Sequence, residues 1–290
     1  ADPRVYVIGL GVPDPKGIFG TTAGLQAKYG PSRVMDMPCS EGAVTGIVTG
    51  SALVGMRPIM THQRIDFALL AIEQIVNQAA KWHYMFGGKM KVPMVVRLLI
   101  GRGWGQGPQH SQSLQAWFAH VPGLKVVMPA TPHDAKGLLV ASVEDDNPVI
   151  FIEHRWLHNV SDDVPEGLYR VPLGEARVAR VGRDVTLVCT SYMVLEGLRS
   201  AEILAKAGVE AEVVDLRTLR PLDTGTILSS VRKTGRLVVA DTGHQSFGVS
   251  AEIAALAAEQ AFDALKAPPV RIALPDCPTP TSPALAEHFY

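Results

Sequence analysis

Two ionisable residues stand in settings that suit chemistry. Glu41 follows Ser40 at the start of a run made almost entirely of Gly, Ala, Val, Thr and Ile. A glutamate is seldom buried without a partner. Its carboxylate therefore either stabilises the start of a helix through the helix dipole or faces a ligand, and its pKa would then be tunable. The residue types alone leave both interpretations open.

His110 ends a glycine-rich segment that follows an apolar run. Four of the seven residues 101–107 are glycines, so this segment cannot form a stable helix or strand. Ligands of open α/β sheets bind in loops at this place, and histidine titrates near neutral pH. We therefore favour a catalytic or ligand-contacting His110 over a purely structural one.

A third motif, Gly9-Leu10-Gly11, is a weaker candidate. A dinucleotide fingerprint would need a third glycine at position 14, where Asp14 stands between Pro13 and Pro15. The prolines also oppose a helix start at this point. A plain turn after a strand is the better interpretation.

The elements that must position these residues are those of an α/β protein. The chain has 290 residues, 47% hydrophobic and 19% charged, which excludes a disordered chain. A net charge of -1 provides no global basic field for nucleic acid or anionic membranes. No apolar run approaches the roughly 20 residues that span a bilayer. The three cysteines lie far apart, which disfavours a disulfide framework or structural zinc and favours a reducing compartment, the bacterial cytosol or the mitochondrial matrix.

Strand-length and helix-length segments alternate along two stretches of the chain, which predicts two parallel-sheet domains joined by right-handed crossovers. This alternation of strand-length and helix-length segments is lost over 154–175, so we expect domains at 1–160 and 170–290. The small and apolar residues of Glu41–Leu53 predict a helix buried on most sides. The longest predicted helix covers 66–86 and ends at Gly87-Gly88. The expected strands are Val5–Ile8, Val34–Met37, Pro58–Thr61, Met94–Val96, Leu124–Met128, Pro148–Ile152, Val185–Cys189, Val209–Val214, Leu237–Ala240 and Val270–Ile272.

Several motifs carry a family resemblance. They are Ser40-Glu41-Gly42, Asp66-Phe67 followed by Glu73-Gln74-Ile75-Val76-Asn77-Gln78-Ala79-Ala80-Lys81, Gln109-His110-Ser111-Gln112-Ser113, Pro122-Gly123-Leu124-Lys125-Val126-Val127-Met128-Pro129 and Asp146-Asn147-Pro148. In order and interval they resemble the β subunit of thiamine-diphosphate-dependent 2-oxo acid dehydrogenases, which act on pyruvate, branched-chain acids or acetoin, along almost the whole chain. The resemblance implies a transketolase-like pyrimidine-binding domain followed by a transketolase C-terminal domain. Family members usually begin with one more helix, so we expect a truncated or processed chain.

The resemblance also implies site residues. Glu41 would hydrogen-bond the aminopyrimidine of the cofactor and favour its imino tautomer, whose nitrogen can accept the proton of the thiazolium carbon. Phe67 would stack on that ring, although core packing is an alternative. Gln63 is expected at the same cofactor site. His110 would be the active-site histidine that holds the intermediate and assists proton transfer or acyl transfer to lipoamide.

The same resemblance addresses metals and partners. A structural potassium ion is implied at Ser142, Val143, Asp145 and Asn147, although an ordinary Asp-Asn-Pro turn explains the same residues. The family's Gly-Asp-Gly motif, which binds Mg²⁺ and the diphosphate, does not occur in this sequence. An α subunit should therefore supply the Mg²⁺ site, within an α2β2 heterotetramer that could serve a lipoyl acyltransferase.

The sequence departs from the family just before Phe67, at His62 and Arg64. These polar residues either face the substrate channel, or His62 caps a strand end while Arg64 reaches to a subunit interface. The leading hypothesis is decarboxylation of a 2-oxo acid with acyl transfer to a lipoyl carrier. A second is transketolase-like or acyloin-forming ketol transfer to a polar aldehyde, and a third is a non-catalytic scaffold subunit.

Overall fold

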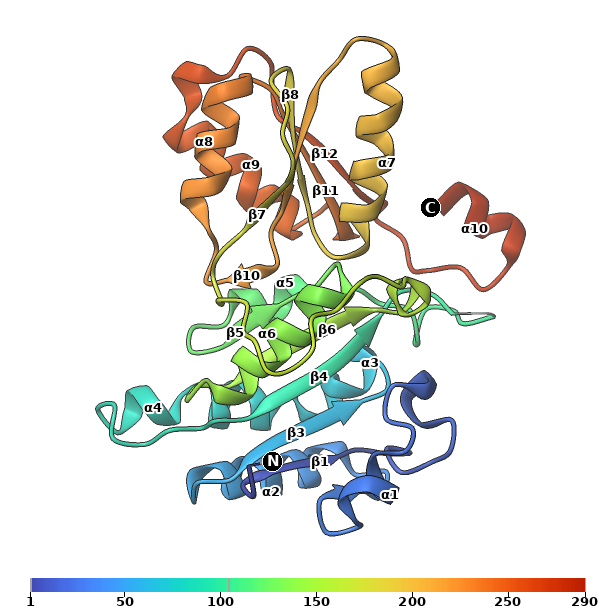
Figure 1. The fold of residues 1–290 in the computed structure, drawn as a ribbon, viewed down its shortest axis with the longest axis vertical. Helices are drawn as coiled ribbons and strands as arrows, with labels where there is room; N and C mark the ends of the chain where they lie inside the picture. Colours follow the sequence, from blue (N-terminus) through green and yellow to red (C-terminus); the bar gives the residue numbers. More distant parts are fainter. Residues whose placement is uncertain (1, 104, 290) are drawn as a thin grey trace.

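The computed structural model describes residues 2–103 and 105–289. It contains two sheets, one above the other in Figure 1, each covered by helices. The seven-stranded sheet has the order β10-β5-β6-β4-β3-β1-β2, and the five-stranded sheet has the order β12-β11-β8-β9-β7. Most neighbouring strands are parallel, which confirms the predicted fold class.

The first sheet is built almost wholly from the first half of the chain. Its strands are β1 (Val5–Ile8), β2 (Val34–Met35), β3 (Arg57–His62), β4 (Val95–Ile100), β5 (Lys125–Val127) and β6 (Val149–His154). The longer helices of this half are α2 (Glu41–Leu53) and α6 (Pro132–Glu144), and the short ones are η1 (Gly17–Gly20), α1 (Leu25–Tyr29), α5 (Gln115–His120) and η4 (Arg155–Asn159).

Strand β4 is buried on both faces, and its side chains alternate between two apolar clusters. Val96 and Leu98 belong to the cluster that contains Val48 of α2, whereas Val95 packs with Leu138 of α6. This period of two is what a strand buried between helical layers produces. It fixes the direction of β4 and therefore the place where the glycine-rich loop begins.

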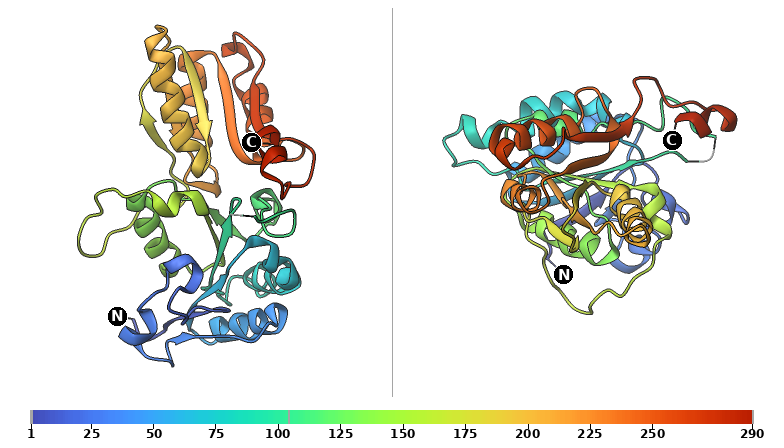
Figure 2. Two further views of the ribbon diagram at one scale, coloured as in Figure 1. Left: turned by 90° about the vertical axis from the view of Figure 1, so that its right-hand side faces the viewer. Right: turned by 90° about the horizontal axis from the view of Figure 1, so that it is seen from above.

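The second sheet uses β7 (Arg177–Arg180), β8 (Val185–Cys189), β9 (Ala211–Asp215), β11 (Leu237–His244) and β12 (Val270–Leu274). In Figure 1, α7 (Tyr192–Lys206) covers one face, and α8 (Thr224–Thr234) and α9 (Val249–Gln260) cover the other. The remaining elements are η5 (Phe262–Ala264) and α10 (Pro283–Phe289), which extends away from the sheet (Figure 2).

Two edge strands differ from the expected all-parallel sheets. Strand β7 pairs antiparallel with β9, and β10 (Thr218–Arg220) pairs antiparallel with β5. Strand β10 comes from the second half of the chain yet completes the first sheet. The two halves therefore share backbone hydrogen bonds as well as one apolar cluster, which contains both Val126 and Leu219.

The predicted helix over 66–86 is broken into four pieces. They are α3 (Ile65–Ala68), the 3₁₀ turn η2 (Leu69–Ala71), the π-helical turn η3 (Gln74–Ala79) and α4 (Trp82–Met85). Ile65, Ala68, Ile75 and Ala79 all face the core across these changes of helical pitch, as their spacing would also place them on one face of a regular helix. Among the described residues, no helix has the length and apolar character to cross a membrane.

Candidate active site

The carboxyl edge of the first sheet gathers the candidate residues. Strand β3 ends at His62 and leads into α3, which carries Phe67, while β4 ends at Ile100 and leads into the loop that carries His110. The Phe67 and His110 rings lie 5.5 Å apart between centroids, with their planes at 78°. Residues separated by 43 positions thus form an edge-to-face pair. The structure brings these two predicted site residues together.

Glu41 is the first residue of α2. The next residue, Gly42, approaches the neighbouring helical segment so closely that an added Cβ would lie 2.9 Å from the Leu70 carbonyl oxygen. This glycine therefore sets the start of α2 beside the segment that carries Phe67. Within the described part of the chain, no hydrogen bond or ion pair is made by the Glu41 carboxylate, and the Ser40 side chain does not cap the helix.

His62 is a buried neutral histidine at the end of β3. The residue is only 3% exposed, and burial lowers the pKa of its imidazole to about 4. Its Nε2 atom, like the buried Ser111 hydroxyl, has no hydrogen-bond partner among the described residues. Such orphaned polar atoms at the sheet edge indicate that a ligand or a second chain completes the site.

Arg64 has a role that neither sequence interpretation anticipated. The residue is 1% exposed, and its guanidinium donates to the Gly101 carbonyl and to the Gln106 side-chain oxygen. It also lies over the Phe19 ring, 5.2 Å from the centroid. Arg64 therefore holds the glycine-rich loop instead of reaching to the surface. Its predicted contact with substrate stays a prediction.

Two amides complete the positioning of the loops. Gln63 donates from Nε2 to the Leu10 carbonyl at 3.0 Å, which fastens the turn after β1, so at least part of its amide serves the fold. Gln112 donates to Asp66 at 2.8 Å and ties the end of the glycine-rich loop to α3. Burial raises the pKa of the Asp66 carboxyl. Trp104, in the same loop, lies outside the described residues.

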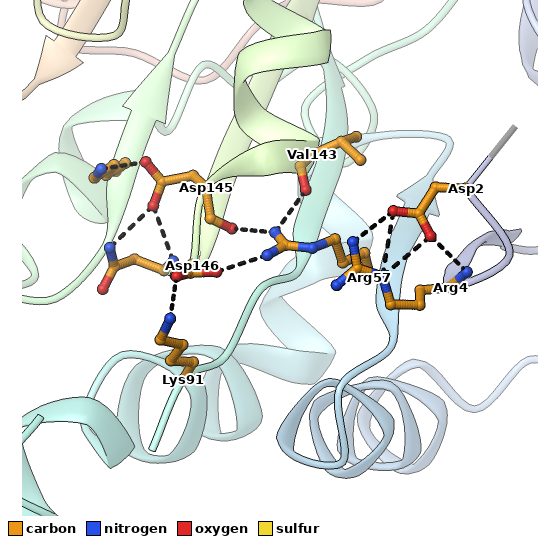
Figure 3. Close-up of polar contacts among 9 residues, drawn as sticks. Asp2, Arg4, Arg57, Lys91, Val143, Asp145 and Asp146 are labelled. Carbon is orange, nitrogen blue, oxygen red and sulfur yellow. Dashed lines mark hydrogen bonds and ion pairs between the residues drawn. The ribbon is translucent and has the colours of Figure 1, made fainter. Parts of the chain in front are cut away.

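The residues suggested for potassium lie at the end of α6 and in the turn that follows it: Ser142 and Val143 belong to the helix, and Asp145 and Asn147 come after it. Figure 3 shows the contacts of Val143 and Asp145. Arg57 donates from Nη1 to the carbonyl oxygens of Val143 and Asp145, at 2.9 and 3.0 Å, and from Nη2 to Asp146 at 2.6 Å. The Asp145 carboxylate accepts two hydrogen bonds from Asn147, both at 2.9 Å. Two of the four suggested carbonyl groups therefore already carry a hydrogen bond from a guanidinium.

The Arg64–Gln106 and Gln112–Asp66 contacts were not predicted from the sequence. The only signal was that amide side chains interrupt and follow a run of glycines. An amide in such a run can bond the local backbone, as Gln106 does with the Gly103 N–H, or it can fix the loop against another element. Only the arrangement of β3 and β4 side by side shows which element that is.

Comparisons with known proteins decide the family. Residues 1–159 match the transketolase pyrimidine binding domain, and residues 174–290 match the transketolase C-terminal domain. The β subunit of acetoin:2,6-dichlorophenolindophenol oxidoreductase from Cupriavidus necator is 49% identical over 94% of this chain and 80% of its own length. This chain belongs to the β subunits of the 2-oxo acid dehydrogenase family.

Further relatives agree with this assignment. The mitochondrial pyruvate dehydrogenase E1 component subunit beta-2 of Oryza sativa is 44% identical over 97% of this β-type chain and 76% of its own length. A solved structure titled a split gene transketolase, inactive beta4 tetramer, has a TM-score of 0.79 at 25% identity and covers 99% of this chain, which covers 88% of that one. The transketolase fold predicted from the sequence motifs is thereby confirmed.

Proposed function

We propose that this β subunit, together with an α subunit, decarboxylates a 2-oxo acid and transfers the acyl group to a lipoyl carrier. The observation that carries the proposal is the Phe67–His110 pair. The Glu41 carboxylate, which has no partner in the described chain, begins a helix whose Gly42 lies against the segment that carries Phe67. A scaffold subunit would have no use for an aromatic ring, an imidazole and a carboxylate at one sheet edge.

The residues present fit thiamine diphosphate, because the edge offers a carboxylate, an aromatic ring and orphaned polar atoms. When bound, that cofactor supplies a carbon nucleophile that stores the electron pair left by decarboxylation. Glu41 would hold a proton at its carboxylate and pass it to and from the aminopyrimidine. Phe67 would support that ring, and His110 would move a proton at the reacting substrate.

The α subunit is expected to hold Mg²⁺ and the diphosphate, since the sequence lacks the Gly-Asp-Gly motif. Relatives named β subunits support such a partner. An α2β2 assembly, service to a lipoyl acyltransferase and a place in the bacterial cytosol or mitochondrial matrix complete the proposal. Potassium at the turn after α6 would use the second lone pairs of the Val143 and Asp145 carbonyls, and its test is a higher melting temperature in KCl than in NaCl.

Glu41→Gln tests the role of the carboxylate in the assembled complex. Loss of a proton-relay group should slow exchange of the cofactor's acidic carbon-bound proton by about 10²–10⁴-fold while the melting temperature is kept. Glu202→Gln, on the exposed side of α7, is the matched control and should exchange at the wild-type rate. Unchanged exchange in Glu41→Gln would remove Glu41 from the mechanism.

His110→Ala tests the later step. Because His110 stands on the loop and not on α2, cofactor binding should persist while acyl transfer to lipoamide falls more than decarboxylation with an artificial electron acceptor. His120→Ala, at the exposed end of α5, is the control for removal of an imidazole. If both activities fall in parallel with thermal stability, His110 only braces the loop.

A second candidate function is chemistry on hydroxyketones, as in acyloin formation or cleavage. It is favoured by the relative named for acetoin and by the buried polar His62 at the site. Product analysis with and without a lipoylated acceptor separates the two candidates: acyl-lipoamide supports the first, and a ketol formed from a polar aldehyde supports the second.

A further inference from the structure

A cavity of about 630 Å³ has none of Glu41, Phe67 and His110 among its described lining residues. Its wall is formed by the loop after β4, by η4 and by the segment that leads into α10 of the C-terminal tail (Figure 1). The polar and aromatic residues that line it are Arg102, Arg155, Trp156, Asn159, Thr281 and Ser282.

The charge of this wall is one-sided. Two arginines line the cavity, and none of its described lining residues is acidic. Arg155 Nη1 and Arg102 Nε are buried N–H groups that have no hydrogen-bond partner in the described chain. Leaving a charged donor buried and unpaired costs free energy. These two N–H groups are available to an acceptor with negative charge that enters the cavity.

Both guanidinium groups are held in place before any ligand binds. Arg155 lies over the Phe19 ring, 3.7 Å from its centroid, and burial lowers the pKa of Arg155. Arg102 donates from Nη2 to the Thr281 carbonyl at 3.0 Å. Ring stacking and a single backbone contact fix each plane and leave other N–H groups for an oxyanion, which guanidinium recognises through paired donors.

The cavity has room for more than an inorganic ion. Its volume lies in the range of small-molecule sites, about 300–1,000 Å³. Trp156 provides a flat apolar wall: the residue is 37% exposed, and its indole is fixed by a hydrogen bond from Nε1 to the Arg102 carbonyl at 2.7 Å. Asn159 and the Thr281 and Ser282 hydroxyls offer neutral hydrogen bonds around the same space.

We propose that this cavity binds a small organic anion that carries a phosphate or carboxylate group. The anionic end faces Arg102 and Arg155, and the organic body lies against Trp156. The bound anion would take no part in the thiamine-dependent reaction itself. The site is coupled to the catalytic loop, because Thr281 packs so tightly against Gly107 that an added Cβ there would lie 2.1 Å from the threonine hydroxyl. Gly107 in turn accepts a hydrogen bond from the His110 N–H.

The test is a titration of the full chain with inorganic phosphate and, separately, with succinate, each against chloride at equal ionic strength. Binding is followed by calorimetry and by tryptophan fluorescence, with Trp156→Phe to assign the signal. We expect saturable binding of at least one anion, and the better ligand identifies the group as phosphate or carboxylate. Absence of saturable binding by both anions at millimolar concentrations would overturn the proposal.

Variants locate the site. Arg155→Gln and Arg102→Gln should each weaken binding about tenfold or more, the effect of losing one charge-assisted hydrogen bond. Arg199→Gln removes an exposed arginine of α7 that pairs with Glu196, and it should bind as wild type. If an arginine variant fails to fold, Asn159→Leu removes a polar lining group and leaves both guanidiniums in place. Equal affinity in all folded variants would refute the site.

Discussion

Asp215 offers a sharp electrostatic test of how the two halves of this protein meet. Its carboxylate is fully buried at the end of β9, 3.5 Å from Arg177, and accepts from the Arg217 N–H. Arg177 and Arg217 also contact Asp134 of α6, Arg217 with a 2.9 Å bond and Arg177 at 3.9 Å. Two acids thus share two arginines, and His133 faces Asp134 from the same helix at 3.2 Å.

The two acids have opposite shifts. Burial raises the pKa of Asp215 from 3.8 to about 6, because Arg177 offsets the lost hydration only in part and Asp134 repels the charge. Burial also opposes ionisation of Asp134, but the two hydrogen bonds from Arg217 outweigh it and lower the pKa of Asp134. At about 1.4 kcal/mol for each pH unit, ionising Asp215 in the folded state costs about 3 kcal/mol.

The direction in which stability changes with pH follows from the linkage between protonation and folding. A carboxyl whose folded pKa is raised contributes stability that is complete below about pH 4 and is lost as the pH rises through about 6. Asp215→Asn cannot ionise, so it should match the wild type near pH 3, exceed its free energy of unfolding by about 1 kcal/mol at pH 4.5, and exceed it by up to about 3 kcal/mol at pH 7.5. The assay is urea unfolding at a series of pH values, with the difference between variant and wild type plotted against pH.

Asp134→Asn is the matched control, since it removes the other buried carboxylate of the network. Its stabilising charge is present above the ordinary pKa and lost in acid, so this variant should be less stable than wild type by about 3 kcal/mol at pH 7.5. A pH-independent difference between Asp215→Asn and wild type would refute the reasoning, because the carboxyl would then titrate alike in the folded and unfolded chains.

Two further predictions concern the sheet edge. The folded pKa of His62 is about 4, so its contribution to stability is complete above about pH 6.5 and falls by about 2 kcal/mol at pH 5. Urea titrations of His62→Leu at pH 7 and pH 5 should not show this loss. If the variant loses as much stability between pH 7 and pH 5 as the wild type, His62 stays hydrated in the folded chain. For Arg64 and Gln106, a double-mutant cycle with Arg64→Met and Gln106→Ala should give a coupling energy of about 1–2 kcal/mol in unfolding experiments; additive effects would mean that Gln106 does not hold the loop through Arg64.

The local amino-acid sequence by itself determined several helices and strands of this protein. The helix over Glu41–Leu53 was predicted with the bounds that the structure shows, because a run of small and apolar residues after Ser40 leaves few other conformations. Strand β8 was predicted with the bounds that the structure shows, because Val185–Cys189 is rich in β-branched and apolar residues and lies between polar segments. The chemical roles of Glu41 and His110 stay predictions, which rest on the glycines and side chains around them and on the family resemblance.

The tertiary structure decided what depends on residues far apart in sequence. Strand β10 joins the first sheet by pairing with β5, which lies about ninety positions earlier in the sequence. No local pattern encodes a pairing between residues so far apart. The helix after His62 changes pitch along its length, and the apolar spacing, which fits a regular helix, did not indicate these changes. Arg64 turned out to hold a loop, since only adjacent strands β3 and β4 bring Gly101 within its reach. Periodicity specifies elements, whereas long-range packing and burial specify which polar groups meet and therefore where a site can form.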